Sequence, residues 1–283
     1  MMEFSGKLRH LLGLSKAIGP VGALNIWSRR ALRRPGAVAV HACGHAIRIR
    51  PTDSDPFVAS QIFGWKDYQL EKGLLRGLLA LVTRQLAAGM RPLIIDAGAN
   101  VGYSAVYFAS MFPDAQVIAI EPDPDTFAEL CLNCSGHPRI RPVQAALWSH
   151  EDGVDLRGTP DAGSWSRQVS EGGGNTASRR LSSLIAEVPS GIPLIVKLDI
   201  EGAEREVMQA DRAIIAAAPC IIIEPHDFMI PGGACLTPLF AALAGREMDT
   251  LVVGENLVFF DSALVREAAP APVTPRQAVS AET

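Results

Sequence analysis

The sequence predicts an α/β fold in which a mostly parallel sheet is covered by helices on both faces. Between residues 93 and 224, short strands that are apolar on both faces alternate with helical segments, a pattern typical of buried parallel sheets. The last two strands are joined by the short turn Gly254-Glu255-Asn256, which favours an antiparallel hairpin. The 283 residues, 48% of them hydrophobic and 20% charged, suffice for one sizeable α/β core with an appendage, or for two small domains.

Residues 1–65 are predicted to form a basic N-terminal α/β extension made of helices and a short hairpin. Residues 1–50 hold nine of the 26 Lys and Arg residues of the chain but one of its 30 acidic residues. Apolar residues among these charges predict a basic amphipathic helix, which either packs on the core or rests on an anionic membrane surface. A turn at Cys43-Gly44 predicts the hairpin, and Asp55 is expected to cap a short helix that ends at Phe63.

Residues 66–265 are predicted to form the core domain. Its expected strands are 93–95, 116–120, 140–147, 194–198, 220–224, 248–253 and 257–261, and its expected helices are 68–88, 101–111, 124–134, 203–217 and 236–244. Residues 151–180, rich in Gly, Ser and charge, are expected to cross the sheet edge as loops, strands or a lid. Residues 266–283, rich in Ala and Pro without periodicity, predict a disordered tail.

Composition argues against several classes of protein. The net charge of −4 argues against a protein that coats nucleic acid, and no run of 18 apolar residues lacks a charge or a break. Five irregularly spaced cysteines argue against a secreted disulfide scaffold, and the N-terminus lacks the pattern of a signal peptide. We therefore expect a cytoplasmic protein, with peripheral contact at the inner membrane surface as an alternative. No feature of the sequence sets an oligomeric state.

The segment 96–102, Asp-Ala-Gly-Ala-Asn-Val-Gly, joins the first core strand to the next helix. Gly98 permits a tight turn and close approach to a ligand, and Gly102 lets the helix pack near the strand. Free N–H groups at the helix N-terminus would face that ligand. Glu121 ends the next strand, where a carboxylate can accept hydrogen bonds from both hydroxyls of a ribose. Together these features predict a site for a nucleoside cofactor.

Charge distinguishes the candidate nucleosides. Asp96 opens the loop, and its carboxylate would be repelled by the pyrophosphate of a dinucleotide. The ammonium and sulfonium groups of S-adenosylmethionine would instead attract it, by about 1 kcal/mol for a solvent-screened pair. The sequence therefore favours this methyl donor over NAD, and methyl transfer over the chemistry of an NAD-dependent oxidoreductase.

Three segments carry a resemblance to a known family. They are Asp96-Ala-Gly-Ala-Asn-Val-Gly-Tyr103, Ile120-Glu-Pro-Asp-Pro124 and Lys197-Leu-Asp-Ile-Glu-Gly-Ala-Glu204. Over about residues 93–254, the chain resembles the FkbM-type methyltransferases, which belong to the class I S-adenosylmethionine-dependent methyltransferases. The resemblance implies a Rossmann-like seven-stranded methyltransferase sheet of order 3-2-1-4-5-7-6 with strand 7 antiparallel, in agreement with the terminal hairpin.

The resemblance also implies which residues bind the donor. Those expected to contact it are Asp96, Gly98, Asn100 and Glu121, with Gly102 shaping the loop and Asp199 as a further contact. Ala145 and Ala146, after the third strand, would lie near the adenine.

An alcohol acceptor must lose its proton, and residues at the carboxyl ends of the fourth and fifth core strands face the acceptor in an open α/β sheet. Asp199 and Glu201 would bind the donor ammonium, orient a sugar hydroxyl or hold a divalent cation. His226 is the expected general base because imidazole titrates near neutral pH; the alternative is a loop histidine satisfied by the backbone. Asp199, Glu224 and His226 would suit Mg²⁺ only if water filled the remaining positions, so we expect no metal.

Three further features have a structural or an open interpretation. Lys197 lies mid-strand among apolar residues and needs a partner, for which we expect Glu224. Trp165 is expected either to stack on a sugar or to pack in an edge strand. Cys131 and Cys134 have CxxC spacing without a second pair, so zinc or redox use is not expected.

The sequence therefore predicts an O-methyltransferase that acts on a hydroxyl of a sugar, a glycolipid precursor or a secondary metabolite. The expected partner is a small-molecule or glycan acceptor and not a nucleic acid. The alternatives are an N-methyltransferase on a small amine or peptide, and a non-catalytic nucleoside-binding module. Asp199-Ile-Glu-Gly stands where enzymes that methylate nucleobase amines have an Asn/Asp-Pro-Pro-Tyr string, which argues against a base amine as acceptor.

Overall fold

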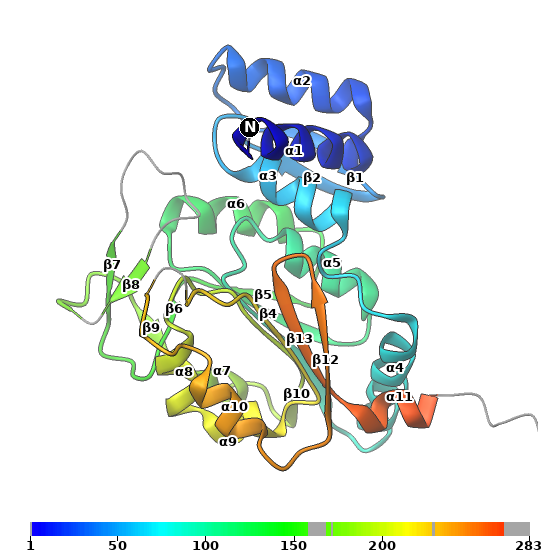
Figure 1. Cartoon of the computed structure of the whole chain (residues 1–283), viewed down its shortest axis with the longest axis vertical. Helices are drawn as coiled ribbons and strands as arrows, with labels where there is room; N and C mark the ends of the chain where they lie inside the picture. Colours follow the sequence, from blue (N-terminus) through cyan, green and yellow to red (C-terminus); the bar gives the residue numbers. More distant parts are fainter. Residues whose placement is uncertain (1, 158–167, 171, 228–229, 269–283) are drawn as a thin grey trace, which may run out of the picture.

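A computed structural model of the chain describes residues 2–157, 168–170, 172–227 and 230–268. Its centre is a seven-stranded sheet in the order β12-β13-β11-β10-β3-β4-β5 (Figure 1). The strands are β3 (Arg91–Ala97), β4 (Gln116–Ile120), β5 (Ile140–Val143), β10 (Gly191–Leu198), β11 (Cys220–Ile223), β12 (Met248–Val253) and β13 (Asn256–Asp261). β5, β4, β3, β10 and β11 pair in parallel, whereas β13 is antiparallel to both of its neighbours. The predicted Rossmann-like class, a mixed seven-stranded sheet with helices, is confirmed.

Alternate residues of each strand face two separate hydrophobic layers, as a sheet buried on both faces requires. One layer contains α4 (Lys72–Ala87), α5 (Tyr103–Met111), α6 (Pro124–Cys134) and α11 (Ser262–Ala268). The other contains α7 (Leu181–Ala186), α8 (Glu204–Ala210), α9 (Arg212–Ala217) and α10 (Thr237–Leu243). Figure 1 shows α8, α9 and α10 on one side of the sheet and α4 and α11 on the other.

The N-terminal extension packs on the core. Its elements are α1 (Met2–Ile18), α2 (Pro20–Ala31), β1 (Val38–Ala42), β2 (His45–Ile49), α3 (Asp55–Ala59) and the π-helical turn η1 (Ser60–Trp65). Leu14, Ile26 and Phe63 belong to the same hydrophobic cluster as Tyr103 of α5. β1 and β2 pair around the turn at Cys43-Gly44, as the sequence predicts.

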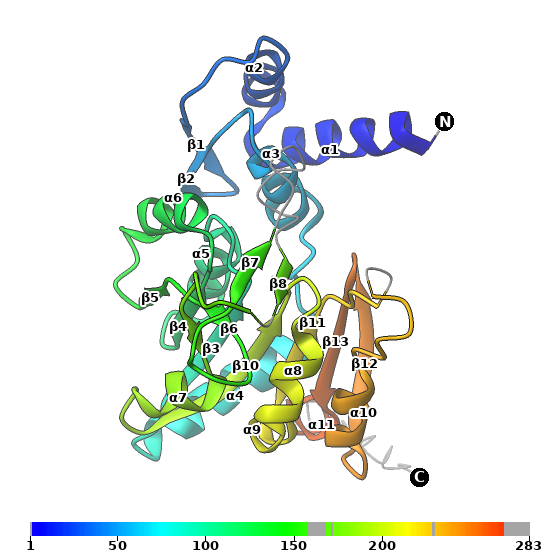
Figure 2. The same ribbon diagram turned by 90° about the vertical axis from the view of Figure 1, so that its left-hand side faces the viewer.

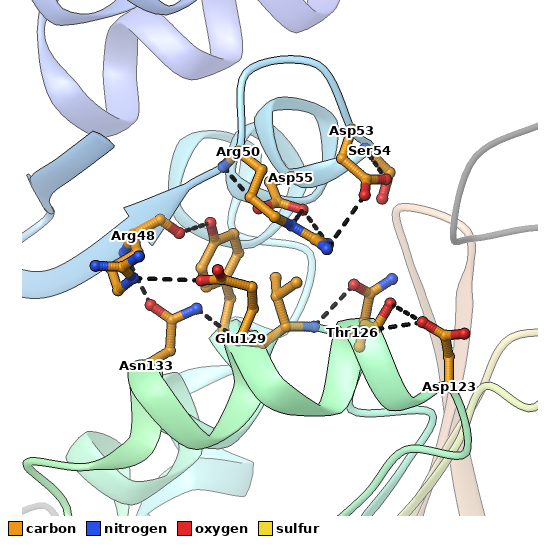
Figure 3. A network of polar contacts seen from close by, with 12 residues as sticks. Arg48, Arg50, Asp53, Ser54, Asp55, Asp123, Thr126, Glu129 and Asn133 are labelled. Carbon is orange, nitrogen blue, oxygen red and sulfur yellow. Dashed lines mark hydrogen bonds and ion pairs between the residues drawn. The ribbon is translucent and has the colours of Figure 1, made fainter. Parts of the chain in front are cut away.

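Polar contacts tie the hairpin to α6 (Figure 3). The Arg48 backbone N–H donates to Asn133 Oδ1 over 2.8 Å, and Asn133 Nδ2 donates to the Val101 carbonyl over 2.8 Å. Arg48 Nε also pairs with Glu129 Oε2 at 3.3 Å. These contacts hold the extension against α6, and α6 in turn against Val101 of the predicted nucleoside loop.

Local side-chain chemistry moves two of the predicted helix starts. Ser54 is at the N-cap position of α3, whereas the Asp55 carboxylate accepts a hydrogen bond from Arg50 Nη2 at 2.8 Å, so the predicted cap at Asp55 is wrong. Helix 68–88 begins only at Lys72, because the Glu71 carboxylate accepts from the N–H groups of the first turn.

Two predicted elements are each divided. Helix 203–217 is broken at Asp211, whose carboxylate accepts from Leu181 N at the start of α7. Strand 140–147 splits into β5 and β6 (Ala146–Leu147), and β6 pairs with β9 (Ser178–Arg179) instead of continuing the ladder with β4.

Within the expected edge region, β7 (Asp155–Arg157) pairs with β8 (Gln168–Ser170). Residues 158–167, including Trp165, lie outside the described part of the chain, as do residues 269–283 of the expected tail. Arg266 and Glu267, where that tail was expected to begin, belong to α11. No helix in the described residues is long and apolar enough to cross a membrane.

Candidate active site

A cavity of about 700 Å³ lies where the loops after β3, β4, β10 and β11 come together. These strands are adjacent in the sheet, and the carboxyl ends of parallel strands meet at one edge, where open α/β sheets bind ligands. The predicted residues that line it are Gly98, Asn100, Glu121, Ala145, Ala146, Asp199, Glu201 and His226. The volume lies within the range of small-ligand sites, roughly 300–1,000 Å³.

The loop after β3 crosses the end of β10 at very short range. Gly98 has φ 75°, and a Cβ atom built there would lie 1.7 Å from the Asp199 carbonyl oxygen. Only glycine therefore fits this position. Asn100 also has positive φ, at 49°, and its Oδ1 accepts from the Val101 N–H over 2.8 Å. The close approach leaves the loop backbone at the cavity wall.

Glu121 is held in place by two backbone donors. Its Oε2 accepts from Asn100 N at 3.0 Å, and its Oε1 accepts from Asp123 N at 2.9 Å. Burial outweighs these donors and raises the pKa of Glu121 to about 7. A fixed, nearly buried carboxylate at a cavity wall can accept hydrogen bonds from two neighbouring hydroxyl groups of a ligand.

Two predicted donor contacts do not line the cavity. Asp96 is fully buried, where Ser104 Oγ donates to its Oδ2 over 2.6 Å and Lys197 Nζ lies 3.1 Å from its Oδ1. Gly102 has φ 85° and packs against Cys134 and Leu130 of α6. Asp96 therefore orients Lys197, and Gly102 fits α5 against α6.

Lys197 pairs with different carboxylates from the one we expected. Its Nζ lies 3.1 Å from Asp96 Oδ1 and 3.3 Å from Asp199 Oδ2, and it donates to the Gly98 carbonyl over 2.8 Å. The expectation of Glu224 is wrong because Lys197 is opposite Asp96 in the β10–β3 register, whereas Glu224 follows the end of β11. Burial lowers the pKa of Lys197, but the neighbouring groups, the charges of Asp96 and Asp199 among them, together raise it well above its usual value, so Lys197 stays cationic.

Carboxylates dominate the side of the cavity that the β10 and β11 loops supply. Asp199, Glu201 and Glu224 all line it. Burial, followed by the charge of Asp199, raises the pKa of Glu201 to about 7 and of Glu224 to about 8. Glu201 has φ 55° in the turn before α8. This part of the cavity therefore favours a cation or a donor of hydrogen bonds.

His226 is nearly buried, and the carboxyl group of Glu204 orients its ring. Its Nδ1 lies 2.7 Å from Glu204 Oε1, and its Nε2 lies 3.8 Å from both Asp199 Oδ1 and Glu224 Oε1. Burial lowers the pKa of His226, but the hydrogen bond and charge of Glu204, with the charge of Asp199, raise it to about 9. The predicted base is therefore an imidazolium at neutral pH in the ligand-free protein.

Asp199, Glu224 and His226 also form the group that could hold a metal ion within the described residues, with one ligand atom of each within 4.8 Å of the others. The carboxylates of this group already have two cationic neighbours, Lys197 and His226. Lys197 Nζ is 3.3 Å from Asp199, and His226 is itself charged at neutral pH. These charges would have to be displaced or lost before a divalent cation could bind.

The N-terminal extension supplies a wall that sequence reasoning missed. His10 of α1, Phe57 of α3, Gln61 of η1 and Asp67 line the cavity, with Glu255 from the β12–β13 turn. A signal was present in part, because the segment from Asp55 to Tyr68 resembles the region that precedes the core in FkbM-type methyltransferases. Nothing in the residue pattern placed α1 beside the strand ends.

The fold and the cavity define a Rossmann-like methyltransferase. The family model described as "Methyltransferase FkbM domain" matches residues 96–253, which is more than half of the chain. The chain therefore belongs to the FkbM family and is an S-adenosylmethionine-dependent methyltransferase.

Two curated relatives are methyltransferases. The hexuronic acid methyltransferase AglP of Haloferax volcanii is 28% identical over 175 residues, covering 60% of this chain and 69% of that protein. The 2-O-methyltransferase NoeI of Sinorhizobium fredii is 25% identical over 155 residues, covering 48% of this chain and 64% of that protein. Among solved structures, the O-methyltransferase TomG of Streptomyces achromogenes, in complex with SAM, is 13% identical with a TM-score of 0.38, covering 68% of this chain and 80% of that one.

Proposed function

We propose that the protein transfers a methyl group from S-adenosylmethionine to a hydroxyl group of a sugar. The observation that carries this proposal is the Glu204–His226 pair, which puts an oriented base in the same cavity as Glu121. The names of AglP and NoeI support a sugar acceptor, since one is a hexuronic acid methyltransferase and the other a 2-O-methyltransferase.

The donor half of the cavity fits an adenosyl compound. Glu121 would accept hydrogen bonds from the two ribose hydroxyls, and the Gly98 loop would lie along the donor. Ala145 and Ala146 would leave room for the adenine. Asp199 would attract the ammonium group. When bound, the donor supplies a methyl group already activated by a sulfonium, so the chain mainly has to position the acceptor and exclude water.

The acceptor half requires a base. We propose that His226 Nε2 takes the hydroxyl proton, while Glu204 holds Nδ1 and stabilises the imidazolium that forms. His226 must first lose a proton, and a bound cationic donor would lower its pKa through charge repulsion. Asp199 and Glu201 would orient the hydroxyl. We propose no metal in this step, because Lys197 and His226 already face the carboxylates that would bind one.

The acidic side chains that line the cavity also influence which acceptors can bind. Once they are ionised, Glu201, Glu224, Asp67 and Glu255 favour a sugar that is uncharged where it enters the cavity, because a carboxylate or phosphate there would be repelled. A small amine is the second candidate, since the same carboxylates would attract an ammonium group. The methylated atom separates the two, because one product carries the new methyl group on oxygen and the other on nitrogen.

The strands of the sheet can be assigned to the class topology. We propose that β3, β4, β5, β10, β11, β12 and β13 are strands one to seven, so that the observed order is 3-2-1-4-5-7-6 with strand 7 antiparallel. We also propose residues 1–65 as an extension and 66–265 as the catalytic domain.

Mass spectrometry tests the proposed function. Glycans and metabolites of the native host, compared with and without the gene, should differ by one methyl group on a sugar oxygen. The purified protein should reproduce that transfer after dialysis against EDTA. Donor binding without methylation in a broad panel of sugars would contradict the proposal, and methylation of amines alone would favour the second candidate.

A further inference from the structure

The helices α1 and α2 leave an unusual amount of apolar surface exposed. Among the described residues, the exposed large apolar side chains of this segment are Leu8, Leu11, Leu12, Val21, Leu24 and Leu32. An equal number are distributed over all the rest of the described chain. Single exposed apolar side chains are ordinary, but a concentration on consecutive elements marks an interaction surface.

Each helix carries two apolar faces. In α1, Leu8 and Leu12 share one face by helical spacing and lie opposite the side of the buried Leu14 and Ala17, with Leu11 at the border between the two faces. The second face of α1 is therefore not used by the fold, since its packing on η1 and α3 employs the first.

The same arrangement recurs in α2. Val21 and Leu24 are 81% and 68% exposed, whereas Ala23 and Ile26 are fully buried on the opposite side. Figures 1 and 2 both show α2 at one end of the molecule, distant from the sheet. The exposed stripe of α2 thus faces outward from the extension.

The surface around these stripes is strongly basic. Between Glu3 and Asp53 the chain has no acidic residue. Lys16, Arg33 and Arg34 are exposed, and Arg29 is partly exposed beside the stripe of α2. A second copy of this chain would bring like charges together, whereas a surface of anionic lipid headgroups complements both the charge and the apolar side chains.

We propose that α1 and α2 bind the surface of an anionic membrane, with Leu8, Leu11, Leu12, Val21 and Leu24 entering the headgroup boundary. The same extension supplies His10 and Gln61 to the cavity wall, so binding there would bring acceptors carried by lipids to the enzyme. This consequence for the acceptor rests on the proposed function; the membrane binding does not.

Co-sedimentation with vesicles tests the proposal directly. The full chain should partition onto phosphatidylcholine vesicles with about 30 mol% phosphatidylglycerol at least about tenfold more strongly than onto phosphatidylcholine alone. The difference should shrink when NaCl is raised from about 0.05 to about 0.5 M, because salt screens the headgroup charge. The variant V21D/L24D should lose at least about tenfold in partitioning.

A matched variant distinguishes this surface from general hydrophobicity. Phe240 and Val252, which are 55% and 73% exposed on other elements, should tolerate F240D/V252D with partitioning unchanged. R29E/R34E should reduce binding to the anionic vesicles alone. All variants should keep the affinity for S-adenosylhomocysteine, which separates this result from any failure of the proposed function.

Three outcomes would overturn the proposal. Equal partitioning onto both kinds of vesicle would indicate adventitious hydrophobic adsorption. Equal losses in V21D/L24D and F240D/V252D would mean that the two helices have no special role. A dimer in sedimentation velocity that V21D/L24D dissociates would assign the surface to contact between two copies.

Discussion

Glu121 has the most sharply defined prediction at the scale of the residue. Its carboxylate is fixed by the Asn100 and Asp123 N–H groups, so its removal would leave those donors and the ribose hydroxyls without an acceptor. Glu121→Ala should weaken S-adenosylhomocysteine binding by about 1–3 kcal/mol, measured by calorimetry. Glu121→Gln, which retains one acceptor, should lose less. Wild-type affinity in the alanine variant would refute the ribose assignment.

The affinity for that ligand should also depend on pH through Glu121. The ionised carboxylate is the better acceptor, and burial raises the pKa of Glu121 to about 7. Affinity should therefore rise with pH through neutrality and level off above it. In Glu121→Gln, which does not titrate, calorimetry over the same range should find this dependence reduced to the part that Glu201 and Glu224 contribute.

Glu204 acts through His226, so its test is a pH profile. Glu204→Gln removes the negative charge beside Nδ1 and should lower the pKa of His226 from about 9. Methyl transfer needs the neutral imidazole, so kcat/KM should rise with pH, and the variant should reach half of its maximum at a lower pH. His226→Asn should lose about 10²-fold or more together with the rising limb. A fall in rate without movement of the midpoint would leave Glu204 with a structural role alone.

At the scale of the element, the crossing of the β3 loop over β10 can be tested at Gly98. Gly98→Ala combines a left-handed φ of 75° with a Cβ placed 1.7 Å from the Asp199 carbonyl oxygen. Gly89→Ala is a matched control, because Gly89 has φ 74° and open space around its Cβ. The control should cost about 1–2 kcal/mol of unfolding free energy, the usual penalty of the left-handed region. Gly98→Ala should cost more in denaturant titrations and weaken donor binding; equal costs would contradict the close crossing.

Elements defined by local signals were predicted well. Strand Gln116–Ile120 and helix Pro124–Cys134 have the predicted bounds, the latter because Asp123 caps the helix through Thr126 N. Elements defined by distant partners were not. The Asp55 carboxylate accepts a hydrogen bond from Arg50 instead of capping α3. The pairing of β6 with β9 ends the third strand before residue 147.

The candidate site was predictable where its residues follow the ends of parallel strands. The strand-end residues Gly98, Glu121, Asp199 and His226 reach one cavity because parallel topology requires it. The partner of Lys197 was not predictable, because it depends on the register between β10 and β3, which the sequence leaves open.

At the scale of the whole molecule, the cavity makes stability depend on pH. Burial raises the pKa of Glu224 to about 8. Burial lowers the pKa of His226, but the hydrogen bond and charge of Glu204, with the charge of Asp199, together raise it to about 9. A group whose folded pKa is raised stabilises the protein below its unfolded pKa and loses that contribution as pH rises through the folded value. The ligand-free protein should therefore lose stability from about pH 4.5, the usual pKa of Glu224, and through the usual pKa of His226 at 6.5, until the folded values of about 8 and about 9 are passed.

Glu224→Gln isolates one source of this loss, because glutamine resembles the neutral carboxyl group that burial beside Asp199 favours. At pH 8.5 the variant should melt at least about 2 °C above the wild type, since 1 kcal/mol corresponds to about 2–4 °C in a domain of this size. Near pH 5, where Glu224 is protonated in the folded protein, the two melting temperatures should converge. The exposed Glu247→Gln serves as control and should show neither effect. Since a cationic donor relieves the same repulsion, S-adenosylmethionine should bind the wild type more tightly than the variant at pH 8.5, and at equal concentration it should stabilise the wild type more. A variant less stable than the wild type at pH 8.5 would mean that Glu224 is an ionised partner of His226. This side of the cavity would then lack the unbalanced negative charge that is expected to attract the cationic donor.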